Sequence, residues 1–305
     1  MARRSKPGGR FKWAVLGALL ALIGFFLVPI IFFQIYFSLH QWTVYLSEWW
    51  AADFVGLETF AEVFQDYRFL QAFIRSFIFA GSATFVSLVI GFILAFLMYQ
   101  EFRGRTFFYL CFITPMLMVP IVIGYNFEML LVEKGPLNQI LTWLKGEPVR
   151  TAWLAEKVPA FLAIIFIEVW NWTPLVFIII LAGLAGMPRE PIEAAQVLGA
   201  SRWKVFREVQ LPFLRPVIVL ACILRFLEAL AEFPKVWSLT TGGPGTFTET
   251  LPVYLYITSW EYFNVSKGAA MSYVVLVVIG LVIFTAIKIL LREKRSLDII
   301  FAKQS

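Results

Sequence analysis

Charged residues are scarce in this sequence, and so are the side chains that most often perform catalysis. Charged residues make up 15% of the 305 residues and hydrophobic residues 60%, whereas soluble proteins carry about a quarter charged residues. There is one histidine, His40, and the two cysteines, Cys111 and Cys222, lie in apolar runs without metal-site or disulfide spacing. These deficits argue against an acid–base or nucleophilic enzyme and favour an integral membrane protein.

Nucleotide-binding motifs are also missing. The sequence contains no Gly-x-x-x-x-Gly-Lys-Ser/Thr segment, the loop that cradles phosphates in ATPases. We therefore expect no ATP hydrolysis by this chain, and no bound cofactor or metal. The formal net charge of +6 is typical of the basic cytoplasmic segments of a membrane protein and does not indicate nucleic acid as a partner.

Long apolar stretches dominate what is present. Six of them are long enough to cross a bilayer, and they cover residues 13–39, 73–99, 106–131, 159–187, 213–233 and 268–291. The first is too long for the apolar region of a signal peptide, so we interpret it as a retained span. Pro115 and Pro120 interrupt the third and predict a kink. The expected fold class is all-α: a polytopic membrane protein with six transmembrane helices.

The distribution of Lys and Arg predicts the orientation. Basic residues gather in residues 1–12, beside the turn at Arg103 and Arg105, in residues 188–212 and in residues 292–305, and such segments stay in the cytoplasm. We expect a cytoplasmic tail over 1–12, a transmembrane domain over 13–291 and a second cytoplasmic tail over 292–305. Residues 40–72, 133–157 and 234–267 are then external loops. No internal duplication is visible, so an inverted-repeat carrier is not suggested.

The polar segment 188–212 has the local signals of two short helices joined by a bend. Pro191 suits a first helical turn, which predicts a helix over 191–198. Gly199 can adopt the left-handed angles that end it, and Ser201 can cap a second helix over 202–210. Pro212 is incompatible with the interior of that helix, so we expect the chain to turn there.

This segment carries a family resemblance. Glu193-Ala194-Ala195, then Gly199 four residues later and Leu211-Pro212, resembles the cytoplasmic EAA loop of permease subunits in binding-protein-dependent ABC importers, although that family often has Asp where this chain has Leu198. The resemblance implies that the loop fits a cleft on an ATPase subunit through Glu193, Ala194, Ala195, Gly199, Ala200, Leu211 and Pro212. An ordinary connector, or a DNA-binding helix-turn-helix using Arg202, Lys204 and Arg207, is the alternative.

Other stretches resemble the carbohydrate branch of these permeases. They are Leu239-Thr240-Thr241-Gly242-Gly243-Pro244, Tyr254 with Tyr256, and Gly268-Ala269-Ala270. The resemblance implies a prokaryotic inner-membrane protein that imports a sugar or related polyhydroxyl solute. It also implies a heteromeric complex with a second permease subunit, two ATP-binding subunits and an extracytoplasmic solute-binding protein.

Charged and polar side chains inside the apolar runs are the candidates for a solute pathway, because a charge at the bilayer centre is costly and usually lines a cavity or meets a partner. Glu168, Asn171 and Trp172 lie together in the fourth span and Glu232 at the end of the fifth. Carboxylate and amide groups bind hydroxyls, and aromatic faces cover a sugar ring. Arg225 and Glu228, three residues apart, are better explained as an intramembrane ion pair.

Several functions remain open from the sequence. A gradient-driven carrier, a permease for a different small organic solute, and a scaffold or receptor subunit without a pathway would each share the six apolar spans. Uptake that survives ATP depletion would distinguish the carrier, and absence of solute flux would distinguish the scaffold. The sequence does not select among polyols, glycosides, oligosaccharides and glycerol phosphates.

Overall fold

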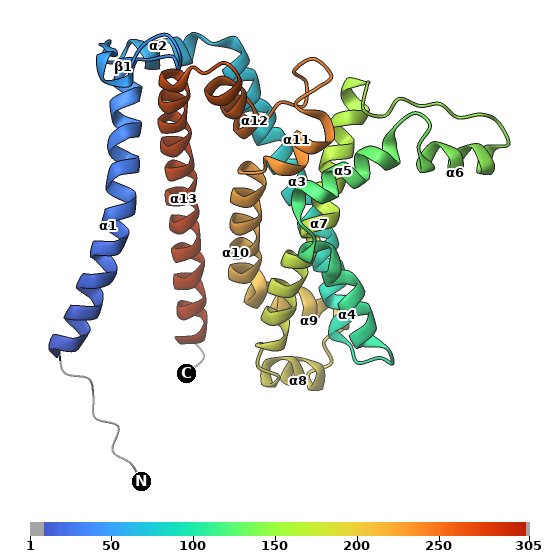
Figure 1. Cartoon of the computed structure of the whole chain (residues 1–305). Coiled ribbons are helices and arrows are strands. Elements are labelled where there is room, and N and C mark those ends of the chain that lie inside the picture. Colours follow the sequence, from blue (N-terminus) through green and yellow to red (C-terminus); the bar gives the residue numbers. More distant parts are fainter. Residues whose placement is uncertain (1–8, 303–305) are drawn as a thin grey trace. The chain divides into compact units, whose positions relative to one another are not determined.

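The computed structural model describes the backbone of residues 9–302 and the side chains of residues 13–288. Arg3, Arg4 and Lys6 of the predicted N-terminal tail, and Lys303 of the predicted C-terminal tail, lie outside the described residues. The described part of the chain divides into two compact units, one formed by residues 9–66 and 255–275 and the other by residues 67–254 and 276–302. The helices are labelled in Figure 1.

The first unit contains α1 (Gly9–Leu39) and the segment that follows it. Here the predicted external loop 40–72 forms a small hairpin of β1 (His40–Gln41) and β2 (Asp53–Phe54), with a 3-10 turn at Trp49–Ala51 and α2 (Glu58–Gln65). The start of α13 (Val265–Ala302) is attached to this segment by two contacts. Trp42 N donates to Ser266 Oγ (2.7 Å), and Lys267 Nζ lies 2.6 Å from Asp66 Oδ2.

Three long helices form the core of the second unit: α3 (Tyr67–Tyr99), α7 (Lys157–Ala185) and α10 (Leu211–Leu230). Small residues let α3 and α7 approach closely. A Cβ atom added to Gly91 would lie 2.8 Å from Val176 Cγ1, so the two helices touch at this point. Ala95, Val176 and Phe177 are buried around it. Because this packing holds α7 along its length, the segment after it projects from a rigid support.

The third predicted span is broken rather than kinked. It forms α4 (Arg105–Ile113), a 3-10 turn (Thr114–Leu117) and α5 (Pro120–Leu131), which continues toward α6 (Pro136–Lys145). The axes before and after the break differ by 96°. Val119 is extended, as expected for a residue that precedes proline. Pro120 therefore starts a new helix in a new direction, so the interruption predicted at the two prolines is present and is sharper than the expected kink.

Two of the predicted external loops also contain helices that the sequence did not reveal. Residues 133–157 include α6, and residues 234–267 include α11 (Pro234–Thr240), α12 (Leu251–Tyr256) and a π-helical turn at Ile257–Glu261. These helices are too short for periodicity to stand out. Both α6 and α11 begin with proline in the first turn, a local signal that was available in the sequence.

The all-α fold class is confirmed, but the number of spans is not. Within the described residues, four helices are long and apolar enough to cross a membrane, and five if the bent α4–α5 pair is one span. The predicted fifth span, α10, carries three charged side chains, Arg215, Arg225 and Glu228. Six spans therefore remain a prediction. The backbone of α13 continues to Ala302, past residue 292, where the C-terminal tail was expected to begin.

Candidate functional site

The loop 188–212 folds as two short helices around a left-handed glycine. Helix α8 covers Glu190–Val197, and Gly199 has φ 78°. Ala200 N donates to Ala195 O (3.0 Å) and Gly199 N to Gln196 O (2.9 Å), the two bonds of a Schellman cap. Ser201 Oγ accepts from Lys204 N (3.3 Å) at the start of α9 (Arg202–Val205). The helix-ending role predicted for Gly199 and the capping role predicted for Ser201 are confirmed.

Three large apolar side chains of this otherwise polar loop are exposed. Val197 is 88% exposed, Leu198 86% and Trp203 67%. Among the residues proposed for ATPase coupling, Glu193, Ala194 and Gly199 are exposed, whereas Ala195, Ala200, Leu211 and Pro212 are half-buried. Ile192 packs against the buried core around Val176. A tight, capped bend with exposed large apolar side chains is typical of a surface that another protein covers.

The expected turn at Pro212 is absent. A π-helical segment, Phe206–Gln210, follows α9, and Leu211 N donates to Phe206 O, so the chain runs helically into α10. In a regular α-helix the proline ring clashes with the carbonyl four residues earlier. The wider π turn relaxes this clash, which is why Pro212 does not end the helix. The C-terminal part of the loop 188–212 is thereby continuous with α10.

Aromatic rings connect the exposed surface of the loop to α3. The ring centroid of Trp203 lies 5.3 Å from that of Phe206, and the Phe206 ring lies 5.3 Å from Phe96 and 6.2 Å from Phe92. Phe92 and Phe96 pack against the buried core that includes Ala95 and Val176. The loop is therefore packed against α3 through these rings and is also continuous with α10.

A buried charge cluster joins α7, α10 and α11, and its hub is Lys235. Lys235 Nζ lies 2.8 Å from Glu168 Oε2, 2.8 Å from Glu232 Oε2 and 3.0 Å from Asn171 Oδ1. The two carboxylates form ion pairs with the ammonium group, which also donates a hydrogen bond to Asn171 Oδ1. All four side chains are buried. Asn171 Nδ2 donates to Pro115 O (2.6 Å), which ties the cluster to the break between α4 and α5.

Arg225 belongs to the same cluster, with a partner that the sequence did not suggest. Its Nη2 lies 2.7 Å from Glu168 Oε1, whereas its Nη1 lies 3.9 Å from Glu228 Oε2. The predicted Arg225–Glu228 pair is therefore the weaker contact. Arg225 projects from α10 toward α7, and an i,i+3 pattern within one helix cannot reveal a neighbour on another.

The structure brings together all four candidate pathway residues. Glu168, Asn171 and Glu232 share Lys235, and Lys235 Nζ lies 5.8 Å from the centre of the half-buried Trp172 ring. The sequence missed Lys235 because it falls in what we interpreted as an external loop. Its position three residues after Glu232, directly after Pro234, was the only available signal. Trp172 Nε1 and Arg225 Nε have no acceptor among the described residues.

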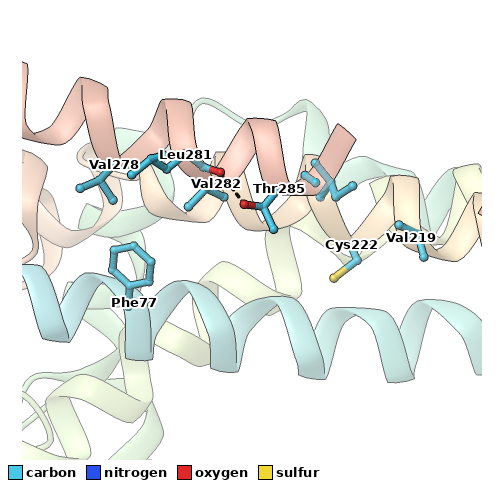
Figure 2. Close-up of a pocket in the computed structure, with 9 residues that line it drawn as sticks. Phe77, Val219, Cys222, Val278, Leu281, Val282 and Thr285 are labelled. Carbon is cyan, nitrogen blue, oxygen red and sulfur yellow. Dashed lines mark hydrogen bonds between the residues drawn. The ribbon is translucent and has the colours of Figure 1, made fainter. Parts of the chain in front are cut away.

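An apolar groove elsewhere in this unit is a poor candidate for solute. It is a cavity of about 560 Å³ between α3, α10 and the second half of α13. Figure 2 shows Phe77, Cys222 and Val282 on its walls. The only hydroxyl in the lining, on Thr285, already donates to Leu281 O (2.8 Å). Among the described residues no group of three or more His, Cys, Asp or Glu side chains is arranged to hold a metal.

Long packed apolar helices, an exposed apolar loop at one end and buried charges in the core define a polytopic membrane transport subunit. The chain belongs to the family of binding-protein-dependent transport system inner membrane components, whose family model matches residues 87–296. It is therefore a multi-pass inner-membrane permease subunit of an importer, and not an enzyme.

Individual relatives agree with this assignment. The probable ABC transporter permease protein y4oQ of Sinorhizobium fredii is 35% identical over 253 residues, covering 82% of this chain and 80% of that protein. The trehalose/maltose transport system permease protein MalF of Thermococcus litoralis is 28% identical over 87% of this chain and 88% of that protein. The structure of a bacterial importer of the acidic polysaccharide alginate has the same fold, with a TM-score of 0.77 and 20% sequence identity. The match covers 93% of this chain and 96% of that chain.

Proposed function

We propose that this chain is a membrane subunit of an ATP-driven importer of a sugar or related polyhydroxyl solute. Similarity to permeases named for trehalose and maltose, for multiple sugars and for starch degradation products supports this substrate class. The complex would contain a second permease subunit, two ATP-binding subunits and an extracytoplasmic binding protein. ATP would bind to the partner subunits, and this chain would need no cofactor.

The observation that carries the proposal is the exposed apolar face of the loop 188–212. Val197, Leu198 and Trp203 stand on a bend fixed by two backbone hydrogen bonds and a serine cap. We assign this face to the ATPase contact. With the six spans expected from the sequence, the loop and both termini would then lie in the cytoplasm. Moving a two-state transporter from 1:99 to 99:1 takes about 5.5 kcal/mol of differential binding. A rigid bend can pass this free energy from the ATPase to the membrane helices, because little of it is lost in rearranging the loop itself.

For the solute we propose a path beside Glu168, Asn171, Trp172 and Glu232. The carboxylates and the amide are engaged with Lys235, but the indole N–H of Trp172 and the Nε of Arg225 retain donor capacity. Both atoms are buried in this structure, so they would donate to the hydroxyl oxygens of a solute only when the path opens. Half-burial of the Trp172 ring leaves part of an aromatic face beside them for the apolar side of a sugar.

The test is reconstitution of the full complex in proteoliposomes, with Gly199→Trp as the variant and Gly146→Trp as its matched control. Both glycines follow a helix with positive φ (78° and 71°), and neither has atoms within 4 Å of an added Cβ. Each variant therefore carries the same backbone strain, about 1–2 kcal/mol, without a clash inside the chain.

We expect the wild-type complex to take up labelled maltose or trehalose only with ATP. Gly199→Trp should abolish uptake and binding-protein-stimulated ATP hydrolysis, because its indole would occupy the ATPase contact, whereas Gly146→Trp should retain both. Full uptake and full stimulation in Gly199→Trp would refute the coupling role. Uptake that persists after ATP depletion would instead identify a gradient-driven carrier.

A further inference from the structure

A cavity with both polar and apolar walls lies at the end of α7 opposite the loop 188–212. Its volume is about 510 Å³, and its walls come from α5, from the segment just before α7 and from α11 with the turn that follows it. Helix α7 has 29 residues, or about 43 Å of rise. In Figure 1 α5 and α11 lie at one end of this unit and α8 at the other. The cavity is thus on the side from which solute would arrive.

The walls of the cavity are held in place by buried contacts. Asn138 is 2% exposed and uses its side-chain amide fully. Its Nδ2 donates to Glu133 O (2.9 Å) and Thr151 O (2.8 Å), while its Oδ1 accepts from Trp153 Nε1 (2.9 Å). This amide fixes the segment before α7 to the end of α5. On the opposite side, a Cβ at Gly124 would lie 1.7 Å from Ser238 Oγ, so α5 and α11 are in direct contact.

The lining combines carboxylates with aromatic faces. Glu128 and Glu133 border the cavity, and neither carboxylate has an ion-pair partner in the part of the chain that the structure describes. Tyr125 is half exposed, and the Trp237 ring is fixed by stacking on Phe233 (5.7 Å between centroids, 18° between planes). A volume of this size accommodates a small ligand.

We propose that this cavity is an entry subsite for a neutral polyhydroxyl solute. Carboxylates accept hydrogen bonds from hydroxyl groups, and rigid aromatic rings cover the C–H face of a pyranose. Two uncompensated negative charges repel a uronate, so the subsite selects against acidic sugars. The inference deepens the proposed import of sugars and rests on it. It also separates this chain from its structural neighbour, which imports an acidic polysaccharide.

The experiment measures equilibrium binding of labelled maltose and trehalose to the wild-type complex in nanodiscs, without ATP or binding protein, with a glucuronic-acid disaccharide as competitor. The variant is Glu128→Gln with Glu133→Gln. The control is Glu147→Gln with Glu156→Gln, which removes two exposed carboxylates of the same segment outside the cavity. Uptake by each complex is measured in parallel in proteoliposomes with ATP and the binding protein.

The variant should bind the neutral sugars at least fivefold more weakly. It should also lose the wild-type preference for neutral over acidic sugar, an effect that a merely structural role of the carboxylates would not produce. The control should match the wild type. Wild-type affinity and wild-type preference in the variant, in a complex that imports sugar, would overturn the subsite alone. Absence of ATP-dependent uptake of either sugar by the wild type would contradict the proposed function, and the subsite with it.

Discussion

Lys235 shows how one side chain organises the interior of this permease. Its ammonium group lies between the carboxylates of Glu168 and Glu232, and it also reaches Asn171. Arg225 neutralises the other oxygen of Glu168. A buried charge is tolerated when it is paired and hydrogen-bonded, so these residues stabilise each other, although any one of them alone in an apolar helix would be costly.

Removing this hub should damage the protein more than removing one of its acceptors. Lys235→Met leaves Glu168 and Glu232 buried without their shared cation, and we expect a loss of about 3–5 kcal/mol, seen as a lower thermal midpoint and yield of the complex in detergent. Glu232→Ala leaves Lys235 with Glu168 and Asn171, so assembly should survive while sugar uptake falls. Pairing Lys235→Met with Glu232→Gln should restore part of the stability, since Glu168 keeps Arg225. Equal stability of Lys235→Met and wild type would disprove the role of the hub.

At this scale the sequence revealed the acceptors but not the hub. Glu168, Asn171, Trp172 and Glu232 were identifiable because polar groups are conspicuous within apolar runs. Lys235 was not, because it follows the proline that starts α11, where the chain had ceased to look like a span. The pairing of Arg225 with Glu168 depends on how α7 and α10 pack, which no local pattern encodes.

At the scale of elements, the bend of the loop 188–212 was predictable because its signals are local. A glycine in the left-handed region and a serine cap act over four or five residues, and both were found as expected. The π segment Phe206–Gln210 was not foreseen, since proline usually ends a helix and only the surrounding packing allows it to continue. The break before Pro120 follows a local signal, the extended conformation of the residue before a proline, but its angle of 96° was not foreseen.

The aromatic connection between α9 and α3 leads to a prediction about coupling. Phe206→Ala removes the ring that lies between Trp203 and Phe96, contacts worth about 0.5–1.5 kcal/mol per pair. A loss of about 1 kcal/mol in coupling corresponds to about fivefold in an equilibrium constant. We expect the ATP hydrolysed per sugar imported to rise by about that factor, measured as phosphate release against uptake.

The control for this prediction is Phe107→Ala, which removes a ring of α4 that contacts Phe108 and is 66% exposed. It should leave the ratio of ATP to sugar unchanged. If Phe206→Ala also leaves that ratio at the wild-type value while the complex assembles normally, then the rings only fill space and α3 receives its displacement by another route.

At the scale of the whole molecule, the chain lacks the part of an ATP-driven importer that hydrolyses ATP. The sequence has no phosphate-binding loop, and the loop 188–212 presents exposed apolar side chains. Composition and apolar run length were sufficient to identify the fold class, because bilayer thickness dictates both. They were insufficient for the number of spans, because α10 combines a membrane-length helix with three charges, of which Arg225 and Glu228 form ion pairs in the folded core.

This incompleteness makes a direct prediction. The purified chain in nanodiscs should release no phosphate from ATP, and addition of the ATP-binding subunits should restore hydrolysis that rises further with sugar-loaded binding protein. A colorimetric phosphate assay on the chain, the ATPase pair and the full complex makes the comparison. Hydrolysis by the chain alone, at a rate proportional to its amount after repeated purification, would show that the division of labour proposed here is mistaken.

The hydrogen bond from Asn171 to the carbonyl of Pro115 has a mechanical consequence. It connects the break between α4 and α5 to the buried charge cluster that joins α7, α10 and α11. Separating the α4–α5 break, α7, α10 and α11 from one another would leave buried charges unpaired in an apolar environment. A movement of all four together would keep every pair intact. During the transport cycle this charge cluster should therefore move as a rigid unit. The conformational change must then occur in the segments around it.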